Sequence, residues 1–338
     1  MTTLTSPHDL LAAVPFLVGF HPTNSLVVIA LTDQQIGMAM RIDFPQELDP
    51  DQIAALASHL LREGADSALI VAYIPDEVAD SDFILEPLRE AIALRGVLIR
   101  ECLQVHRDRW RSTICQDQEC CPPEGTAMPD ISTSRISAEQ VAAGQLMPFA
   151  NLAELEASLD SLEVNQELLN EIRKIPAIKY GSDNVIALER EGALAVNELA
   201  TEFSDLGIVE DNKLLALVFV RLLDVQVRDF AMGLVTDQNI LVLASLWRWM
   251  LRIAPPGFVA PVATLFAATS YEEGDGALAQ RALDRALADD SRYPMALLLR
   301  KVFSAGWPPV QFAAMRADLH PRVCALLFPS ESSQAEVS

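Results

Sequence analysis

Three cysteines lie close together near the middle of the chain. Cys115, Cys120 and Cys121 fall within seven residues, and Cys102 lies a short distance before them. Thiolates are ligands of zinc and are also the reactive form in thiol chemistry. His106 could supply a further ligand if the residues on either side of it pair as a hairpin. The sequence therefore predicts one place for metal or thiol chemistry, the loop of Cys115, Cys120 and Cys121 beside His106.

The chemistry of this loop has several interpretations. Structural zinc sites have four ligands, commonly two separated C-x2-4-C pairs, whereas here C-x4-C-C stands alone. A disulfide between Cys115 and Cys120, a reactive thiolate, and cysteines that only pack the loop onto a sheet are the alternatives. Nearby cations could lower a thiol pKa, and flanking carboxylates would raise it. The cations are Arg109, Arg111 and His106, and the carboxylates are Asp117, Glu119 and Glu124.

A second candidate site involves His21, Asn24 and Ser25, which follow Gly19 at the junction of an apolar helix and a strand. These side chains could bind an anion or orient a nucleophile at the strand end, or they could satisfy the turn backbone. We group them with Trp110 as a candidate pocket. The chain has no G-x-S-x-G motif, so a serine hydrolase is not supported.

The first half of the chain has the pattern of an α/β sheet domain, predicted over residues 1–146. Strands are expected at 25–31, 36–44, 68–74, 97–105 and 109–114, and helices at 8–18, 49–64 and 81–94. Apolar runs of this length mark buried strands, and the intervening helices make some strand pairs parallel. We predict a mixed, partly parallel sheet covered by helices. No glycine-rich turn joins a strand to a helix, so no nucleotide cofactor site is predicted.

The second half is predicted as an all-helical domain over residues 147–330, followed by a disordered tail at 331–338. Residues 276–289 and 293–299 carry regularly spaced alanines, similar to one tetratricopeptide hairpin, A-x-x-x-[LF]-x-x-A-L-x-x-D. No second copy follows at the 34-residue period. Local packing therefore explains this hairpin better than a peptide-binding groove.

Two charged groups of the helical half are predicted to be structural. Asp224 and Arg228 are four residues apart, so they can form an ion pair along one helix. Glu272 and Asp275 lie near two glycines without the spacing of a calcium loop. There a glycine ends one helix, and Asp275 caps the next.

Net charge and the first residues exclude several classes of protein. The formal net charge is -22, from 47 acidic and 25 basic residues. Such a chain repels nucleic acid and anionic membranes, so neither is an expected partner. The first residues lack the basic segment of a signal peptide. We therefore expect a cytoplasmic protein with free thiols or a metal site, zinc being the metal considered.

Several stretches together resemble domain-of-unknown-function family 4192, an actinobacterial family. They are P-F-L-V-G-F-H-P-T-N-S-L-V-V-I from Pro15, R-W-R-S-T-I-C from Arg109, C-C-P-P-E-G from Cys120, D-V-Q-V-R-D from Asp224 and G-D-G-A-L-A-Q-R-A-L-D-R-A-L from Gly274. The resemblance implies the α/β-plus-helical layout over nearly the whole chain. It implies no activity, substrate or cofactor.

The leading functional prediction is a non-enzymatic interaction or regulatory module with an unidentified protein partner. It follows from the missing catalytic and nucleotide motifs and from the alanine-rich helical half. The alternative is a metal-binding or thiol-based enzyme or sensor centred on Cys115, Cys120 and Cys121.

Overall fold

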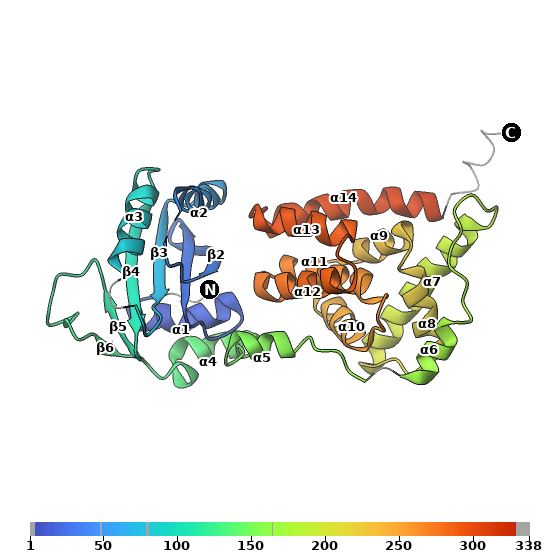
Figure 1. The fold of residues 1–338 in the computed structure, drawn as a ribbon, viewed down its shortest axis with the longest axis horizontal. Helices are drawn as coiled ribbons and strands as arrows, with labels where there is room; N and C mark the ends of the chain where they lie inside the picture. The colour runs from blue at the N-terminus through green and yellow to red at the C-terminus, as the bar shows by residue number, and fades with distance from the viewer. Residues whose placement is uncertain (1–3, 48, 79–80, 164, 329–338) are drawn as a thin grey trace. The chain divides into compact units, whose positions relative to one another are not determined.

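A computed structural model of the protein describes residues 4–47, 49–78, 81–163 and 165–328. These residues form two compact units, one ending at Leu155 and the other beginning at Glu156 (Figure 1). All strands of the described residues belong to the first unit, and the second unit contains helices. The predicted combination of an α/β half and an all-helical half is confirmed. The predicted tail at 331–338 lies outside the described residues.

The first unit contains the predicted strands and helices and two short additional elements. Its strands are β1 (Ser25–Thr32), β2 (Gln35–Asp43), β3 (Ser67–Tyr73), β4 (Leu98–His106), β5 (Arg109–Ser112) and β6 (Thr126–Ala127). Its helices are α1 (Pro7–Val18), α2 (Pro50–Arg62), α3 (Asp82–Ala93), the 3-10 helix η1 (Ile131–Thr133) and α4 (Arg135–Ala142). A further helix, α5 (Leu152–Ala157), contains the division between the two units. The sequence predicts only loop over β6 and η1, which are too short for a hydrophobic period to reveal.

The six strands pair in the order β2-β1-β3-β4-β5-β6. β3 and β4 are parallel and joined through α3, and the other neighbours are antiparallel. Both two-residue hairpin turns have positive φ at each position, with Asp33 and Gln34 in one turn and Arg107 and Asp108 in the other. Such turns match the right-handed twist of paired strands. The sheet is therefore mixed and partly parallel, as predicted.

Helices cover both faces of this sheet. On one face, α2 and α3 contribute Leu60 and Leu85 to a core that includes Ile70 of β3. On the other face lies α1, where the rings of His8 and Trp110 meet edge-on with centroids 5.3 Å apart. Every residue of β3 is buried, as expected of a strand covered on both sides.

The segment after α4 stays with the first unit through backbone hydrogen bonds. The amide of His21 donates to the Phe149 carbonyl at 2.9 Å, and the Phe149 amide donates to the Gly19 carbonyl at 3.0 Å. This pairing holds Phe149 beside the turn that ends α1. The sequence places the domain boundary after residue 146, whereas the compact units divide after Leu155.

The second unit is built around α11, which is buried on all sides. The helices of this unit are α6 (Gln166–Ile172), α7 (Val185–Leu206), α8 (Asn212–Arg221), α9 (Val225–Gly233), α10 (Ile240–Ile253), α11 (Val259–Glu272), α12 (Gly276–Asp289), α13 (Pro294–Ser304) and α14 (Pro309–Leu327). Each residue from Val259 to Tyr271 is buried, as expected of a helix at the centre of a bundle. Among the described helices, none has both the length and the apolar composition that crossing a membrane requires.

A short turn joins α11 to α12, and α12 packs against both α11 and α13. The Asp275 carboxylate accepts a hydrogen bond from the Leu278 amide at 2.9 Å, so the predicted helix cap is confirmed. Alanines, including Ala279 and Ala282, are buried on α12 and permit this close packing. The tetratricopeptide-like character of the hairpin stays a prediction.

Three buried arginines of the second unit are paired with carboxylates. The pairs are Arg221–Glu191, Arg228–Asp229 and Arg316–Glu272. Arg316 and Glu272 are joined by two hydrogen bonds of 2.6 and 2.8 Å, and Arg316 also donates to the Val235 carbonyl at 2.7 Å. The pairs of Arg221 and Arg316 join different helices, α8 to α7 and α14 to α11, and so act as clamps, whereas Arg228 and Asp229 are neighbours on α9.

The predicted ion pair between Asp224 and Arg228 is wrong. Asp224 caps α9, so its carboxylate turns back onto the amides of the first turn and also accepts from the Tyr180 hydroxyl at 2.6 Å. Arg228 binds its neighbour Asp229 instead. The helix-spacing argument failed because the carboxylate is already used by the cap.

Candidate functional site

The three-thiol loop, residues 113–125, leaves the sheet at the end of β5 and returns to it at β6. The amides of Ile114 and Cys115 both donate to the Ser112 hydroxyl, at 3.2 and 3.1 Å. That hydroxyl donates to Glu101 Oε1 of β4 at 2.6 Å. Farther along, the Cys121 amide donates to the Asp117 carbonyl at 2.7 Å. The start of the loop is thus tied to the sheet, and a tight turn brings its cysteines together.

The three sulfurs converge. The Sγ atoms of Cys115, Cys120 and Cys121 all lie within 4.8 Å of one another, and all three cysteines are free thiols. Zinc–sulfur bonds of ~2.3 Å place the sulfurs of a tetrahedral site ~3.8 Å apart. A contraction of about 1 Å would therefore bring these thiols to zinc-binding geometry. Cys120 is exposed, so the cluster is open to solvent on one side.

The environment of Cys121 favours its neutral form. Burial, together with hydrogen bonds from Cys115 and Cys120, raises the pKa of the Cys121 thiol to about 11, while a hydrogen bond from the Ser112 backbone acts in the opposite direction. The sequence left open whether nearby arginines would lower a thiol pKa. For Cys121 the shift is upward, which argues against a reactive thiolate there at neutral pH.

His106 does not join the thiols. In the β4–β5 hairpin His106 pairs with Arg109 next to the turn, whereas the thiol loop leaves the far end of β5. Within the described residues, the group that could hold a metal comprises the three cysteines alone. The hairpin expected from the sequence forms, but it carries His106 and the cysteines to opposite ends of β5. The suggestion of His106 as a further ligand is therefore wrong.

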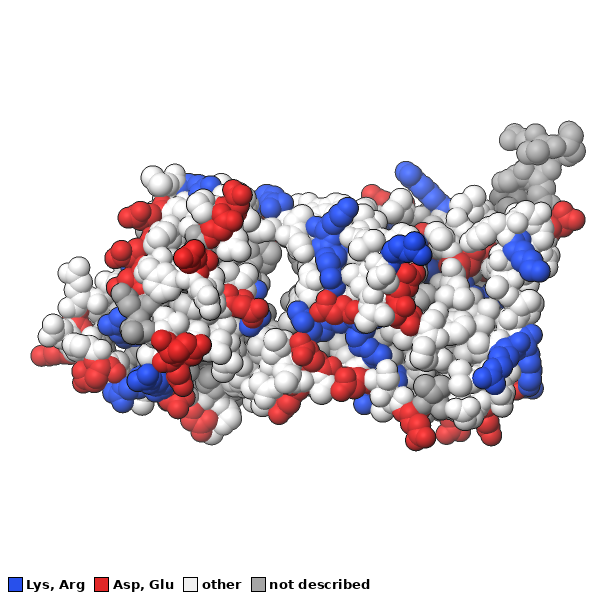
Figure 2. Space-filling view, viewed as in Figure 1, with Lys and Arg blue, Asp and Glu red and all other residues white. Residues whose placement is uncertain are grey.

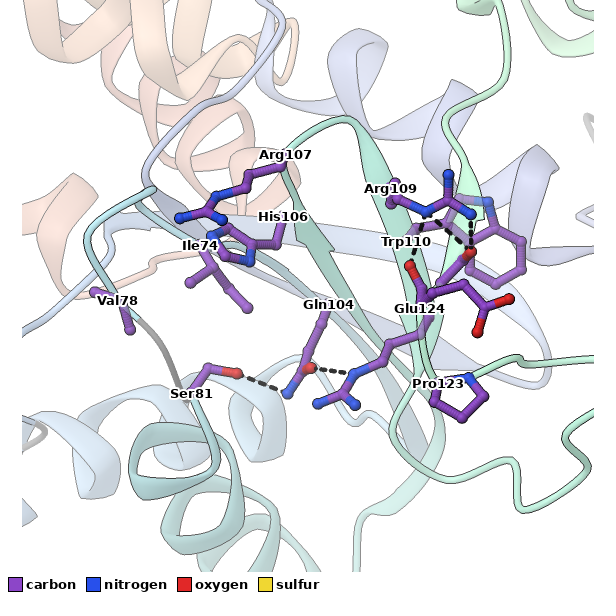
Figure 3. Close-up of a pocket in the computed structure, with 12 residues that line it drawn as sticks. Ile74, Val78, Ser81, Gln104, His106, Arg107, Arg109, Trp110, Pro123 and Glu124 are labelled. Atoms are coloured by element: carbon purple, nitrogen blue, oxygen red, sulfur yellow. Dashed lines mark hydrogen bonds between the residues drawn. The ribbon is translucent and has the colours of Figure 1, made fainter.

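His106 instead lines a pocket of about 320 Å³ on the face of the sheet that α3 covers (Figure 3). The hairpin register puts Gln104, His106, Arg109 and Arg111 on that face. The full lining is Ile74, Val78, Ser81, Gln104, His106, Arg107, Arg109, Trp110, Arg111, Pro123, Glu124 and Gly125. His106 Nε2 is buried without a hydrogen-bond partner among the described residues.

The four residues predicted as a pocket do not lie together. Ser25 begins β1, three strands away from Trp110 across the sheet, or about 14 Å at ~4.8 Å per strand. The buried Ser25 hydroxyl donates to the Thr23 carbonyl and accepts from Arg41 Nε. The Asn24 carbonyl accepts from the Phe44 amide at 2.8 Å. These groups, with the His21 amide on Phe149, support the turn before β1, and only Trp110 lines the pocket of His106.

The family of the chain follows from a match that covers most of both units. The model of the family described as "Domain of unknown function (DUF4192)" matches residues 7–310. The chain belongs to this family. The match includes the three thiols, the pocket of His106 and the core of the helical unit. No curated protein and no solved structure matches the chain.

Gln104 and Ser81 are pocket residues of this DUF4192 chain that are not among the residues predicted from the sequence. Gln104 is only 4% exposed, and its side-chain amide donates to the Ser81 hydroxyl at 2.6 Å. The sequence did carry a signal for Gln104, because residues two apart on a strand share a face, and Gln104 is two residues before His106. A two-residue turn at Arg107 and Asp108 would then have placed Gln104 opposite Arg111. Ser81 could not be found this way, since it comes from the start of α3.

Proposed function

We propose that the first unit is a metal-binding module in which Cys115, Cys120 and Cys121 hold zinc. The observation that carries this proposal is the convergence of three free thiols within 4.8 Å. Thiolate sulfur is a preferred ligand of zinc among the common cellular divalent ions. Three protein ligands leave a fourth position on the exposed side of the cluster for water or another donor.

The ligand set favours a structural or regulatory role over hydrolysis. Three thiolates bring three negative charges to a divalent ion, so the bound metal would be a weak Lewis acid. Hydrolytic zinc sites more often use histidines and carboxylates, which leave the metal electron-poor. The proposal therefore combines a regulatory module with a metal site, and it does not include a catalytic step.

The loop itself gives a reason for a metal. Residues 116–120 are all exposed, so little apolar burial fixes this part of the chain. A metal ion joining Cys115 to Cys121 would cross-link the loop at its base and hold the path from β5 to β6. Metal binding of this kind contributes directly to the stability of a weakly packed segment.

Metal content of the full-length chain tests the proposal. Protein purified without chelator, and then titrated with zinc, should bind one zinc per chain by elemental analysis and native mass spectrometry. Cys115→Ser and Cys121→Ser should each lose that zinc. Cys324→Ser is the matched control, because Cys324 is a half-buried free thiol on α14, and it should keep the metal.

Two results would refute the proposal. One is a wild-type chain with all thiols reduced that takes up no zinc during the titration. The other is loss of zinc in Cys324→Ser to the same extent as in Cys115→Ser. The predicted protein partner of the helical unit is a separate proposal, to which the exposed Leu297 and Leu298 of α13 lend some support.

A further inference from the structure

The pocket of His106 contains three guanidinium groups that are not neutralised by carboxylates. Arg107, Arg109 and Arg111 line it, and no ion pair involves any of them among the described residues. Glu124 is the only acidic residue of the lining. We propose that this pocket binds a small organic phosphate, a site distinct from the three thiols.

Arg111 is held in place while its terminal nitrogens stay available. Its Nε donates to Gln104 Oε1 at 2.7 Å. The Gln104 amide nitrogen donates to the Ser81 hydroxyl at 2.6 Å (Figure 3) and also to Asp82 at 3.3 Å. Because Gln104 is buried and bonded at both ends, it fixes the direction of the guanidinium. Neither Nη atom of Arg111 has a hydrogen-bond partner among the described residues, so both can bind a ligand oxygen.

The other two arginines are held by neutral backbone oxygens. Arg107 donates to the Asp76 carbonyl at 3.1 Å. Arg109 donates to the carbonyls of Glu124 and Gly125 at 2.7 and 2.6 Å (Figure 3). A carbonyl orients a guanidinium without cancelling its charge. The lining therefore has three positive side chains against the one carboxylate of Glu124, although acidic side chains are prominent over the first unit in Figure 2. A local excess of positive charge concentrates anions at a site.

The position of the pocket in the sheet is one where ligands commonly bind. β3 and β4 are the parallel pair, and the pocket is lined by residues at their carboxyl ends, Ile74 and His106. Ser81, which precedes the first turn of α3, forms another part of the wall. In open α/β sheets this is the usual place for a ligand, and helix N-termini favour phosphate groups.

The lining also indicates the chemical class of the ligand. Guanidinium groups match the oxygens of phosphate in forked pairs, and three of them suit a dianion better than a carboxylate with one charge. Ile74 and Val78 add an apolar wall beside the charged one (Figure 3). A phosphate joined to a small apolar or aromatic group would use both walls. Inorganic phosphate would use only the charged wall.

Isothermal titration calorimetry on the full-length chain tests this inference with phenyl phosphate, inorganic phosphate and benzoate as probes. Phenyl phosphate should bind most tightly, and its affinity should fall with added salt. Arg111→Gln should weaken that affinity about tenfold or more, because a charged hydrogen-bond donor is lost. Arg111→Lys should recover part of it. Arg95→Gln is the matched control, since Arg95 is an exposed arginine of the same unit, and it should bind as the wild type does.

The inference is overturned if the wild-type chain binds none of the three probes, or if benzoate binds as tightly as phenyl phosphate. It is also overturned if Arg111→Gln and Arg95→Gln bind equally well. Circular dichroism of each variant shows that the fold is kept. The Cys115→Ser chain should still bind phenyl phosphate, which separates this result from the outcome of the zinc experiment.

Discussion

The buried arginines of the helical unit and the pocket arginines of the α/β unit have different partners. In the helical unit Arg221, Arg228 and Arg316 are buried, and each forms an ion pair with a carboxylate. In the α/β unit, Arg109 and Arg111 contact carbonyl or amide oxygens instead. Both arrangements satisfy hydrogen bonds. Only the second leaves positive charge available to a ligand.

The difference separates structural from binding roles within one acidic chain. A buried charge without a counter-charge is costly, so Arg221, Arg228 and Arg316 each need a carboxylate partner. The pocket arginines lie at a solvent-accessible surface, where water offsets that cost in the absence of a ligand. In these two sets of arginines, ion pairs accompany a buried position in the helical unit, and their absence accompanies an exposed position in the pocket.

The largest expected effect on stability comes from the Arg316–Glu272 pair. Arg316→Met leaves the Glu272 carboxylate, which has 4% of its side chain exposed, without its partner. The free energy of unfolding should fall by about 3–5 kcal/mol, because a buried charge is left unpaired. Urea unfolding followed by circular dichroism measures the change.

Arg281→Met is the control for that variant. Arg281 pairs with Glu156 and Asp284, but its side chain is 38% exposed. Its loss should change the unfolding free energy by no more than about 1 kcal/mol. Equal effects of the two substitutions would contradict the clamp role assigned to Arg316.

A smaller effect is expected from zinc on thermal unfolding. Free zinc at about a hundred times its dissociation constant should stabilise the first unit by up to about 2.7 kcal/mol, the value for zinc that binds the folded chain alone. Differential scanning calorimetry with and without zinc measures this. Cys121→Ser should abolish the difference, and a shift that persists in this variant would show zinc binding elsewhere.

Gly125→Ala should destabilise the pocket wall by about 1–3 kcal/mol. Gly125 has φ of +75°, and a Cβ there would lie 3.0 Å from the Trp110 carbonyl oxygen. Since the Gly125 carbonyl also accepts from Arg109, phenyl phosphate should bind more weakly as well. Thermal unfolding and calorimetric titration check the two effects, and wild-type values for both would contradict this role.

The smallest effect on stability is expected for Arg107→Met. Arg107 is exposed and makes one hydrogen bond, to the Asp76 carbonyl. The unfolding free energy should change by about 0.5 kcal/mol or less, whereas binding of phenyl phosphate should weaken. Loss of stability comparable to that of Arg316→Met would place Arg107 among the clamps and remove the contrast between the units.

Much of the fold could be predicted from the sequence because its signals are local. The buried runs that became β1 and β3 are continuous and apolar, and caps such as Asp275 lie next to the helices that they begin. β6 could not be found, because its two residues carry no period and become a strand only by pairing with β5. The hydrophobic pattern predicts a helix over 309–317, whereas α14 continues to Leu327 with Pro321 inside it.

The candidate site was predicted less completely, because it depends on strand register. The closeness of Cys115, Cys120 and Cys121 in sequence was enough to place them together. Placing His106 required knowing which end of β5 carries the loop. In the β4–β5 register His106 lies opposite Arg109, at the end of β5 away from the thiols. Ser81 comes from another element altogether, so no spacing in the sequence could connect it with Arg111.

The pH dependence of zinc affinity tests the three-thiol site most directly. The pKa of Cys121 is raised to about 11, so this thiol is protonated at neutral pH, and zinc must displace its proton. Affinity should therefore rise with pH, by about tenfold per pH unit for each proton that zinc displaces. Competition with a chromophoric chelator, corrected for its own protonation, measures this slope between about pH 6 and 7. The account predicts a slope of about one or more in the wild-type chain and a smaller one, or no binding, in Cys121→Ser. A flat profile, or the same slope in both chains, would contradict it.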